Sequence, residues 1–353
     1  MKEMGSRIHL KNLSLEEMKS FLLSLDEKPF RAAQVARWLY GRGARSFGEM
    51  SNLSKEFRNK LDAHARISWL ELREVQSSTD GTQKFRFVLE DGEAIESVLL
   101  PERDHWTLCL STQVGCALGC KFCLTGKRGF IRDLTPAEII DQILGVRSTL
   151  PPDKRIRNLV FMGMGEPLLN IENLTRALEI IRSPLGLQFS YRHITVSTAG
   201  VIPQMEAFSA RRHFTQLAIS LNASTDEQRT KLMPINRKYP LKDLLAACRR
   251  LPLANRGKIT FEYVLIRGLN DSEEEGHRLA RLLKGIRAKI NLIPFNEHAQ
   301  SLWKRPDEET VNRFRKILMD AGYTAVIRQS KGKDIMAACG QLGGKNLIGQ
   351  RGI

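Results

Sequence analysis

From residue 107 onward, short apolar segments alternate with amphipathic helical patterns, and this alternation limits the fold more than any other feature. An apolar segment followed by a helical pattern predicts a βα unit, and repeated units build a parallel sheet covered by helices. Six such units indicate an α/β fold, either an open sheet or a partial barrel. The predicted strands are 107–112, 157–162, 193–198, 215–221, 259–266 and 289–295, with a last strand at 324–329. The predicted helices are 135–146, 171–182, 202–210, 225–232, 271–284 and 307–321.

The rest of the chain divides into smaller pieces. Residues 1–66 have helical periodicity and predict a helical accessory domain, and residues 67–106 predict a short β extension with a turn at Asp91-Gly92. The barrel is expected over 107–330, and 331–353 is a glycine-rich C-terminal loop. Several helices carry capping-box sequences, in which a Ser or Thr precedes a Glu by three residues. These pairs are Ser14 with Glu17, Thr135 with Glu138, and Ser272 with Glu275.

Charge is distributed unevenly along the chain. The net charge is +16, yet residues 1–100 carry 16 basic and 15 acidic side chains. The remaining 253 residues hold 39 basic and 24 acidic side chains, a net of +15. A basic excess around a predicted site favours a polyanionic substrate such as RNA, although a solvated basic surface that promotes solubility is the alternative. No apolar run approaches the roughly 20 residues that span a bilayer, and no secretory signal is present, so we expect a cytoplasmic protein without membrane contact.

Three of the six cysteines fall within eight residues, in Cys116-Ala-Leu-Gly-Cys120-Lys-Phe-Cys123. A structural zinc site normally has four Cys or His ligands, and no fourth lies nearby. Three thiolates can instead hold a 4Fe–4S cluster and leave one iron open. The spacing resembles that of the radical-SAM superfamily, in which the open iron binds S-adenosylmethionine and the cluster reduces it to a 5′-deoxyadenosyl radical. A zinc knuckle with a distant fourth ligand, or three core cysteines, are the alternatives.

Polar and glycine residues follow several predicted strands, where ligands bind in parallel α/β folds. Gly163-Met-Gly165-Glu166-Pro167 fits no phosphate-binding loop and resembles the radical-SAM motif whose backbone and glutamate face the ammonium group of S-adenosylmethionine. Each of the polar residues at the later strand ends, taken alone, is more often a turn or cap residue than a ligand. Together they predict a pocket for S-adenosylmethionine. Its expected residues are Gly165, Glu166, Ser197, Ser220, Leu221, Asn222 and Asn296.

With these landmarks in place, the chain resembles the RlmN and Cfr family of radical-SAM RNA adenine methyltransferases over nearly its full length. Asn222 is a departure, because the family commonly has His there. The segments that carry the resemblance are Lys28-Pro-Phe-Arg-Ala-Ala-Gln-Val, Thr107-Leu-Cys-Leu-Ser-Thr-Gln-Val-Gly-Cys116, Gly163-Met-Gly-Glu-Pro-Leu-Leu-Asn170, Met233-Pro-Ile-Asn-Arg-Lys-Tyr239 and Ala337-Ala-Cys-Gly-Gln-Leu342.

The resemblance assigns roles to three further residues. Cys339 matches the family's methyl-carrying cysteine, and Cys109 matches the cysteine that later forms a disulfide with it. Glu96 matches the family's proposed proton acceptor. Without the resemblance, the two cysteines read as small buried apolar residues and Glu96 as an exposed strand glutamate. Cys248 retains the core interpretation, because it shares one apolar helix face with neighbouring leucines.

The implied reaction methylates carbon 2 of an adenine in 23S rRNA and tRNA, and consumes two molecules of S-adenosylmethionine per turnover. An external electron donor such as a flavodoxin system must supply electrons, and we expect a monomer. The nearest alternative is a Cfr-type carbon-8 methyltransferase, but Gly115-Cys-Ala-Leu-Gly-Cys120 and the accessory domain favour carbon 2. A zinc-dependent RNA-binding protein without catalytic activity is the alternative from another functional class.

Overall fold

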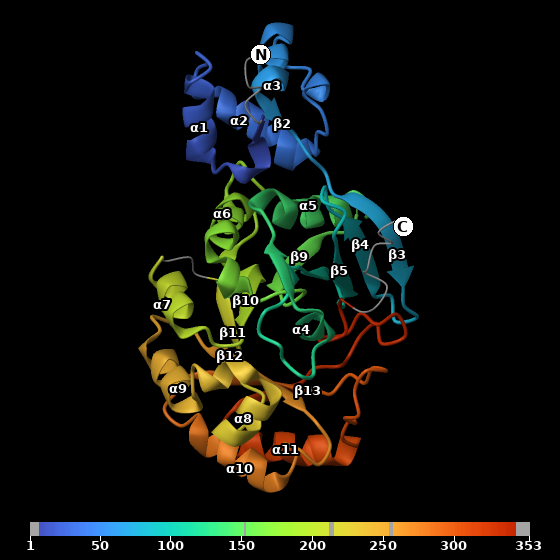
Figure 1. The fold of residues 1–353 in the computed structure, drawn as a ribbon, viewed down its shortest axis with the longest axis vertical. Helices are drawn as coiled ribbons and strands as arrows, with labels where there is room; N and C mark the ends of the chain where they lie inside the picture. The colour runs from blue at the N-terminus through green and yellow to red at the C-terminus, as the bar shows by residue number, and fades with distance from the viewer. Residues whose placement is uncertain (1–6, 152, 212–214, 254–256, 344–353) are drawn as a thin grey trace.

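The computed structural model describes residues 7–151, 153–211, 215–253 and 257–343. Figure 1 shows a small N-terminal helical unit above a larger body, whose central sheet is covered by helices on its outer side. Among the described residues, no helix has the length and apolar character needed to cross a membrane.

Ten strands form the main sheet, in the order β14-β13-β12-β11-β10-β9-β6-β5-β4-β3. The seven strands from β6 to β14 pair in parallel, and β14 and β3 are free edges, so the sheet is open. This arrangement confirms the predicted partial barrel. Its parallel strands are β6 Trp106–Cys109, β9 Ile156–Phe161, β10 Ile194–Thr198, β11 Gln216–Ser220, β12 Ile259–Leu265, β13 Ala288–Pro294 and β14 Thr324–Ile327.

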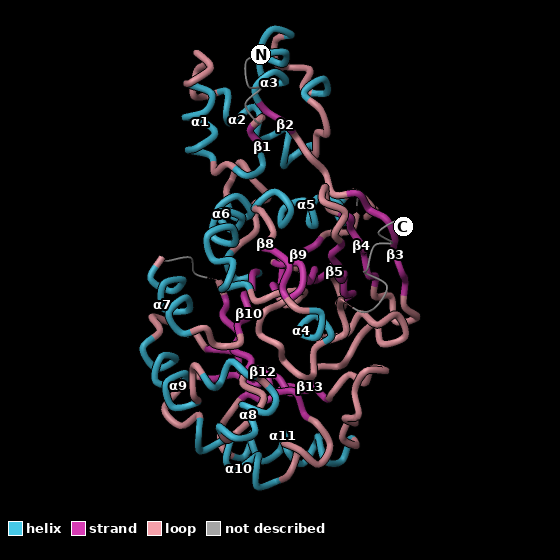
Figure 2. Tube along the Cα trace, viewed as in Figure 1, coloured by secondary structure: helices cyan, strands magenta, loops and turns pink. Residues whose placement is uncertain are grey.

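The helices that follow these strands lie where the periodicity predicts them, and each strand-to-helix step repeats the same unit (Figure 2). One addition is α9, which has the apolar face that contains Cys248. The helices are α5 Pro136–Arg147, α6 Ile171–Arg182, α7 Ile202–Ala210, α8 Asp226–Leu232, α9 Leu241–Arg250, α10 Glu273–Leu282 and α11 Glu308–Asp320.

The predicted β extension is part of the main sheet. Strands β3 Glu71–Ser77, β4 Gln83–Val88 and β5 Ala94–Pro101 form an antiparallel meander, and β5 pairs with β6. As a result, Cys109 lies between Val98 on β5 and Val160 on β9. The segment therefore adds a wall beside the first barrel strand. The expected domain boundaries at 66, 106 and 330 stay predictions, and the residues from 344 onward lie outside those described.

The N-terminal unit is closed by a short parallel pair between its first and last strands. A buried ion pair between Lys11 and Asp141 joins it to α5, and Asn12 Oδ1 accepts a hydrogen bond of 2.9 Å from the Ala137 backbone N–H. These contacts dock the unit on the barrel. Its elements are β1 Ile8–His9, α1 Leu15–Leu23, α2 Arg31–Ala36, a π-helical segment Arg37–Arg42, α3 Lys55–His64 and β2 Ala65–Arg66.

Two of the three predicted capping boxes are complete. Ser14 caps α1 and Thr135 caps α5, and in each case the glutamate three residues later reaches back to the cap. Ser272 caps α10, but Glu275 instead accepts hydrogen bonds from Ser224 Oγ and Gln228. The third pair is therefore a simple cap, because the Glu275 carboxylate binds side chains in and just before α8 instead of the cap.

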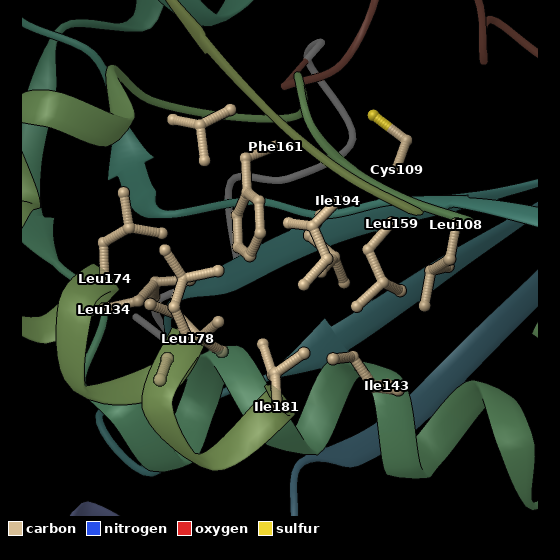
Figure 3. Close-up of a cluster of buried hydrophobic side chains, with 14 of the residues drawn as sticks. Leu108, Cys109, Leu134, Ile143, Leu159, Phe161, Leu174, Leu178, Ile181 and Ile194 are labelled. Atoms are coloured by element: carbon tan, nitrogen blue, oxygen red, sulfur yellow. The ribbon is translucent and has the colours of Figure 1, made fainter. Parts of the chain in front are cut away.

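The hydrophobic core lies between the sheet and its outer helices. Figure 3 shows side chains of β6, β9 and β10 packed against α5 and α6, while Leu108 and Cys109 point to opposite sides of β6. This opposition follows from the alternation of side chains along a strand. Leu108 joins the core, and the sulfur of Cys109 points away from the apolar cluster. The inner face of the sheet is therefore the side on which Cys109 can contribute to a site.

Candidate active site

The cysteine loop lies between β7 Gln113–Gly115 and β8 Phe130–Asp133, two paired antiparallel strands that the sequence patterns did not predict. The backbone N–H of Cys116 donates to the Gly129 carbonyl (2.9 Å), and the N–H of Cys123 donates to the Cys120 carbonyl (3.1 Å). Cys123 then begins the short helix α4 Leu124–Arg128. All three loop cysteines line a cavity at the inner mouth of the barrel.

The three thiols influence one another electrostatically. Burial raises the pKa of Cys116 to about 12, and burial followed by the charges of Cys123 and Cys116 raises the pKa of Cys120. Among the described residues, no three Cys, His, Asp or Glu side chains converge on one point that could hold a single metal ion. A zinc ion requires such convergence at Zn–S distances of about 2.3 Å, whereas a cluster binds each thiolate through a different iron. Three thiols on one wall are the ligand number of a 4Fe–4S cluster with one open iron.

The Gly163–Gly165 turn lies against residues 110–113, which lead into the cysteine loop. Gly165 has a φ of +97°, and a Cβ there would lie 2.5 Å from the Cβ of Gln113, so only glycine fits. Glu166 is buried, and its two carboxylate oxygens accept hydrogen bonds from the backbone N–H groups of Leu168 and Ala199. Burial raises the pKa of Glu166 to about 7. The structure thus uses this carboxylate to join the β9 and β10 loops, while the residue borders the cavity.

The predicted residues on β10 and β11 occupy different positions. Ser197 and Ser220 line the cavity, as does Asn222. The side chain of Leu221 instead lies in the hydrophobic core, and only its backbone reaches the strand end. Asn222 has a φ of +60°, which Asn tolerates better than most residues. Its amide is already engaged, because Oδ1 accepts from the Val264 N–H (2.8 Å) and Nδ2 contacts the Met233 sulfur.

Asn296 and Cys339 meet on the opposite side of the cavity. Asn296 Nδ2 donates to the Cys339 carbonyl (3.0 Å), and among the described residues its buried Oδ1 has no hydrogen-bond partner. An unpaired buried acceptor carries a free-energy cost of about 1–3 kcal/mol. Because Asn296 lines the cavity, this acceptor fits a ligand that brings its own donor, such as a ribose hydroxyl or an adenine amino group.

Cys339 is exposed, and the surface that it exposes faces the cavity. Burial by the surrounding protein raises the pKa of its thiol to about 11, and the negative charge of Glu262 adds a smaller effect in the same direction. Burial and the proximity of Cys339 raise the pKa of Cys109. Cys109 therefore lies within electrostatic range of Cys339, which is 230 residues away in the chain, and Cys339 lines the same cavity as Cys116, Cys120 and Cys123.

Glu96 is buried and is not among the residues that line the cavity. Its carboxylate accepts a 2.9 Å hydrogen bond from the Gly343 N–H and forms an ion pair with Lys84 at 3.4 Å. Lys84 also reaches the Met336 carbonyl (3.5 Å). In this geometry Glu96 anchors the segment that carries Cys339. The structure does not place it at the reacting end of the cavity.

Arg229 is a site residue that sequence reasoning did not identify. It is fully buried on α8, and its guanidinium donates to the carbonyls of Ala199, Ser220 and Leu221, among other acceptors. Burial lowers its pKa to about 10, and Cys120 is the nearest charge that opposes this effect. Arg229 thus holds the ends of β10 and β11 together. In the sequence, Arg229 is one of several polar residues in a predicted helix, and exposed arginines occur in the same setting. No sequence pattern therefore predicts that it is buried.

Comparison with known proteins identifies the family. Residues 8–67 match the ribosomal RNA large subunit methyltransferase N-terminal domain, and residues 110–280 match the Radical SAM superfamily. The dual-specificity RNA methyltransferase RlmN of Geobacter sulfurreducens is 52% identical over 342 residues, which cover 97% of this chain and 94% of that protein. The RlmN of Syntrophus aciditrophicus is 51% identical, with coverage of 97% and 98%. This chain belongs to the RlmN family.

A solved structure supports the same conclusion for the fold. The crystal structure of a radical SAM methyltransferase from Sphaerobacter thermophilus superposes on this RlmN-family chain with a TM-score of 0.91 at 40% identity. The match covers 95% of this chain and 99% of the other. RlmN-family membership implies a 4Fe–4S cluster and S-adenosylmethionine as cofactors. The residues on the cavity wall fit both, with three thiols for the cluster and the unpaired Asn296 Oδ1 for the nucleoside.

Proposed function

We propose that this radical-SAM enzyme methylates carbon 2 of an adenine in 23S rRNA and in tRNA. The observation that carries the proposal is that Cys339 lines the same cavity as Cys116, Cys120 and Cys123, within electrostatic range of the Cys109 thiol. A simple methyl transfer would need neither cysteine. The relatives that are about half identical are RNA methyltransferases described as dual-specificity, which supports both RNA substrates.

Cys116, Cys120 and Cys123 would hold the 4Fe–4S cluster through their thiolates. When bound, the cluster supplies the electron that turns S-adenosylmethionine into a hydrogen-abstracting radical. The glycine turn, Ser197, Ser220 and Asn296 would contact S-adenosylmethionine on the rest of the wall. Asn222 and Glu166 act through the backbone groups that they bind, since their polar atoms already have protein partners.

Cys339 is proposed to accept a methyl group and to present it to the adenine. Carbon 2 of adenine is electron-poor and is not a useful nucleophile, so a carrier that becomes bonded to the ring is required. A thiolate is a good nucleophile for loading the methyl group. Afterwards Cys109 attacks the sulfur of Cys339, and the resulting disulfide releases the methylated base. The effect of Cys339 on the pKa of the Cys109 thiol, which requires the two thiols to lie near each other, supports this release step.

Two kinds of partner complete the proposal. RNA would bind the face around the cavity, in the part of the chain with a net charge of +15. An external donor such as a flavodoxin system would reduce the cluster. Because the disulfide must be reopened in each turnover, a reducing compartment such as the cytoplasm suits the enzyme. We also propose that it acts as a monomer, which its elution volume in size-exclusion chromatography would test.

The experiment that tests this function analyses the methylated product. Reconstituted enzyme is incubated anaerobically with S-adenosylmethionine, a reductant and either unmodified 23S rRNA or unmodified tRNA. Nucleosides are then separated and identified by mass spectrometry against 2-methyladenosine and 8-methyladenosine standards. We expect 2-methyladenosine from both RNAs. Formation of 8-methyladenosine, or of no methylated adenine from either RNA, would overturn the proposal.

A further inference from the structure

Glu262 is a buried carboxylate on the inner face of the sheet, and none of the roles above involves it. It lies on β12, in register with Ser220 on β11 and Asn291 on β13. Residues in register on adjacent strands point to the same face, so these three polar side chains form a row across the sheet. Its neighbours Phe261 and Tyr263 point into the fully buried core. Packing alone would favour an apolar residue at the position of Glu262.

The contacts of Glu262 leave part of its carboxylate free. Asn291 Nδ2 donates to Oε1 at 2.9 Å, and within the part of the chain that the structure describes no residue donates to Oε2. Glu262 is 6% exposed, and the small surface that remains lines the cavity shared with Cys339. A carboxylate with one oxygen held and the other directed to a cavity is suited to accept a proton there.

The charged groups around this pair come from three elements. Lys289 of β13 and Arg328, just after β14, are the cations that act on Glu262, but burial outweighs them and raises its pKa. The charges of Glu262, Arg328 and Cys123 act on the pKa of the Cys339 thiol, and the charge of Glu262 has the largest effect of the three. Glu262 and Cys339 line the same cavity, and the carboxylate lies close enough for its charge to act on the thiol.

The chemistry of methyl loading needs such a group. The pKa of about 11 keeps the Cys339 thiol protonated near neutral pH, whereas the thiolate is the form that attacks a sulfonium methyl group. The two other acidic side chains near the cavity are already engaged. Glu96 binds Gly343 and Lys84, and Glu166 binds two backbone N–H groups. Of the described residues that line the cavity, Glu262 is the carboxylate with an oxygen that accepts no hydrogen bond.

We propose that Glu262 accepts the thiol proton of Cys339 as the cysteine sulfur takes the methyl group from S-adenosylmethionine. The new bond joins the Cys339 sulfur to the methyl carbon, and the bond from that carbon to the sulfonium sulfur breaks. The sulfonium keeps the electron pair and leaves as neutral S-adenosylhomocysteine, while Glu262 becomes a neutral carboxylic acid. No oxidant or reductant is consumed in this step. The proposal rests on the proposed function, because it assigns Cys339 as the methyl acceptor.

The first test measures methyl loading in the reconstituted full-length enzyme without RNA. Glu262→Gln keeps an oxygen that can accept from Asn291, so the fold should persist. Addition of a methyl group to the Cys339 peptide is followed by mass spectrometry after mixing with S-adenosylmethionine. Loading in the variant should fall about 100-fold at pH 7.5, as expected for removal of a general base. It should then recover about tenfold per pH unit up to pH 9 as thiolate forms unaided, a slope that the wild type should lack.

Glu275→Gln is the matched control, because Glu275 is also a buried glutamate but lies on α10, outside the sheet. This control should load at the wild-type rate. If Glu262→Gln loads as fast as wild type at pH 7.5, the proposal is overturned. If the wild type itself never gains a methyl group on Cys339, the proposed function fails instead, so the two failures are distinguishable.

The second test separates a proton acceptor from a nearby negative charge. Removing the charge of Glu262 should lower the pKa of Cys339, so the variant thiol should react faster with iodoacetamide, measured on the same peptide. We therefore expect opposite changes in Glu262→Gln, with faster alkylation and slower methyl loading. If both reactions become faster, Glu262 acts only as a charge, and the assignment is wrong. This readout needs neither RNA nor turnover.

Discussion

The two walls of the cavity are built in different ways. The wall of strand ends is held by contacts within the barrel, such as Glu166 to Ala199 and Asn222 to Val264, which span 33 and 42 residues. The wall that carries Cys339 belongs to the segment 331–343, which is tied to the β3–β5 meander across about 250 residues.

This difference separates two functions. The strand ends are fixed by the sheet, so they suit a cofactor that must stay in place. The Cys339 segment is held by separate hydrogen bonds, to the meander through Asp334 and Glu96 and to the barrel through contacts such as Asn296 Nδ2 to the Cys339 carbonyl. A segment held in this way can open locally at a smaller free-energy cost than strands of a sheet. A methyl carrier must meet S-adenosylmethionine, the adenine and Cys109 in turn. A wall held by fewer and more separate hydrogen bonds is therefore suited to the residue that has several partners.

The largest expected effect concerns the fixed wall. Cys120→Ala should abolish iron binding and reductive cleavage of S-adenosylmethionine, because two thiolates cannot hold the cluster. Cys248→Ala is the control, since Cys248 is a buried cysteine of α9 away from the cavity. Iron content and 5′-deoxyadenosine release measure both variants. A Cys120→Ala protein that still reconstitutes a 4Fe–4S cluster would refute the ligand assignment.

Arg229→Met tests how the fixed wall is held. The substitution leaves the carbonyls of Ala199, Ser220 and Leu221 without a donor, and hydrogen bonds to a charged group are worth about 1.5–3 kcal/mol each. We expect the free energy of unfolding to fall by about 3 kcal/mol in urea titrations of the protein. The exposed Arg237 serves as the control, and Arg237→Met should change it by less than about 0.5 kcal/mol. Equal values for the two variants would contradict the structural role.

Two substitutions of Glu96 distinguish whether this residue anchors the Cys339 segment or accepts a proton. Glu96→Gln keeps an oxygen for the Gly343 N–H, so as an anchor it should retain most of the RNA methylation rate. Glu96→Ala removes the anchor and should be about tenfold slower. A proton acceptor would lose roughly 10²- to 10⁴-fold in both variants. Single-turnover RNA methylation measures the difference, and a large loss in Glu96→Gln would restore the role that the family resemblance assigned to it.

The smallest effect on the methylation rate is expected at the outer end of the wall that carries Cys339. Asp334 accepts hydrogen bonds from Ser78 Oγ (2.6 Å) and the Thr79 N–H (3.2 Å). Asp334→Ala should weaken docking of the segment by about 1 kcal/mol, which slows RNA methylation about fivefold. Cleavage of S-adenosylmethionine without RNA should stay unchanged. If cleavage falls in parallel with methylation, the two walls are not independent.

The two walls also differ in how far the sequence could predict them. The βα alternation predicted nearly every barrel strand, since period and caps are local properties, and the cysteine spacing marked the cluster loop. The sequence did not predict Arg229 or Glu262 as site residues, because no local pattern separates a buried Arg or Glu from an exposed one. The roles of Cys109 and Cys339 came from resemblance alone. Their contact depends on chain segments 230 residues apart, and no local pattern encodes such a contact.

The central claim, that Cys339 carries the methyl group and Cys109 releases the product, is tested most directly with Cys109→Ala. The reconstituted variant is incubated with RNA, S-adenosylmethionine and reductant, and then run on a denaturing gel beside Cys339→Ala. We predict that Cys109→Ala stalls with RNA bonded to Cys339 through a thioether-linked methylene, and that Cys339→Ala leaves the RNA free and unmethylated. Repeated turnover by Cys109→Ala, or a crosslink formed by Cys339→Ala, would contradict the account.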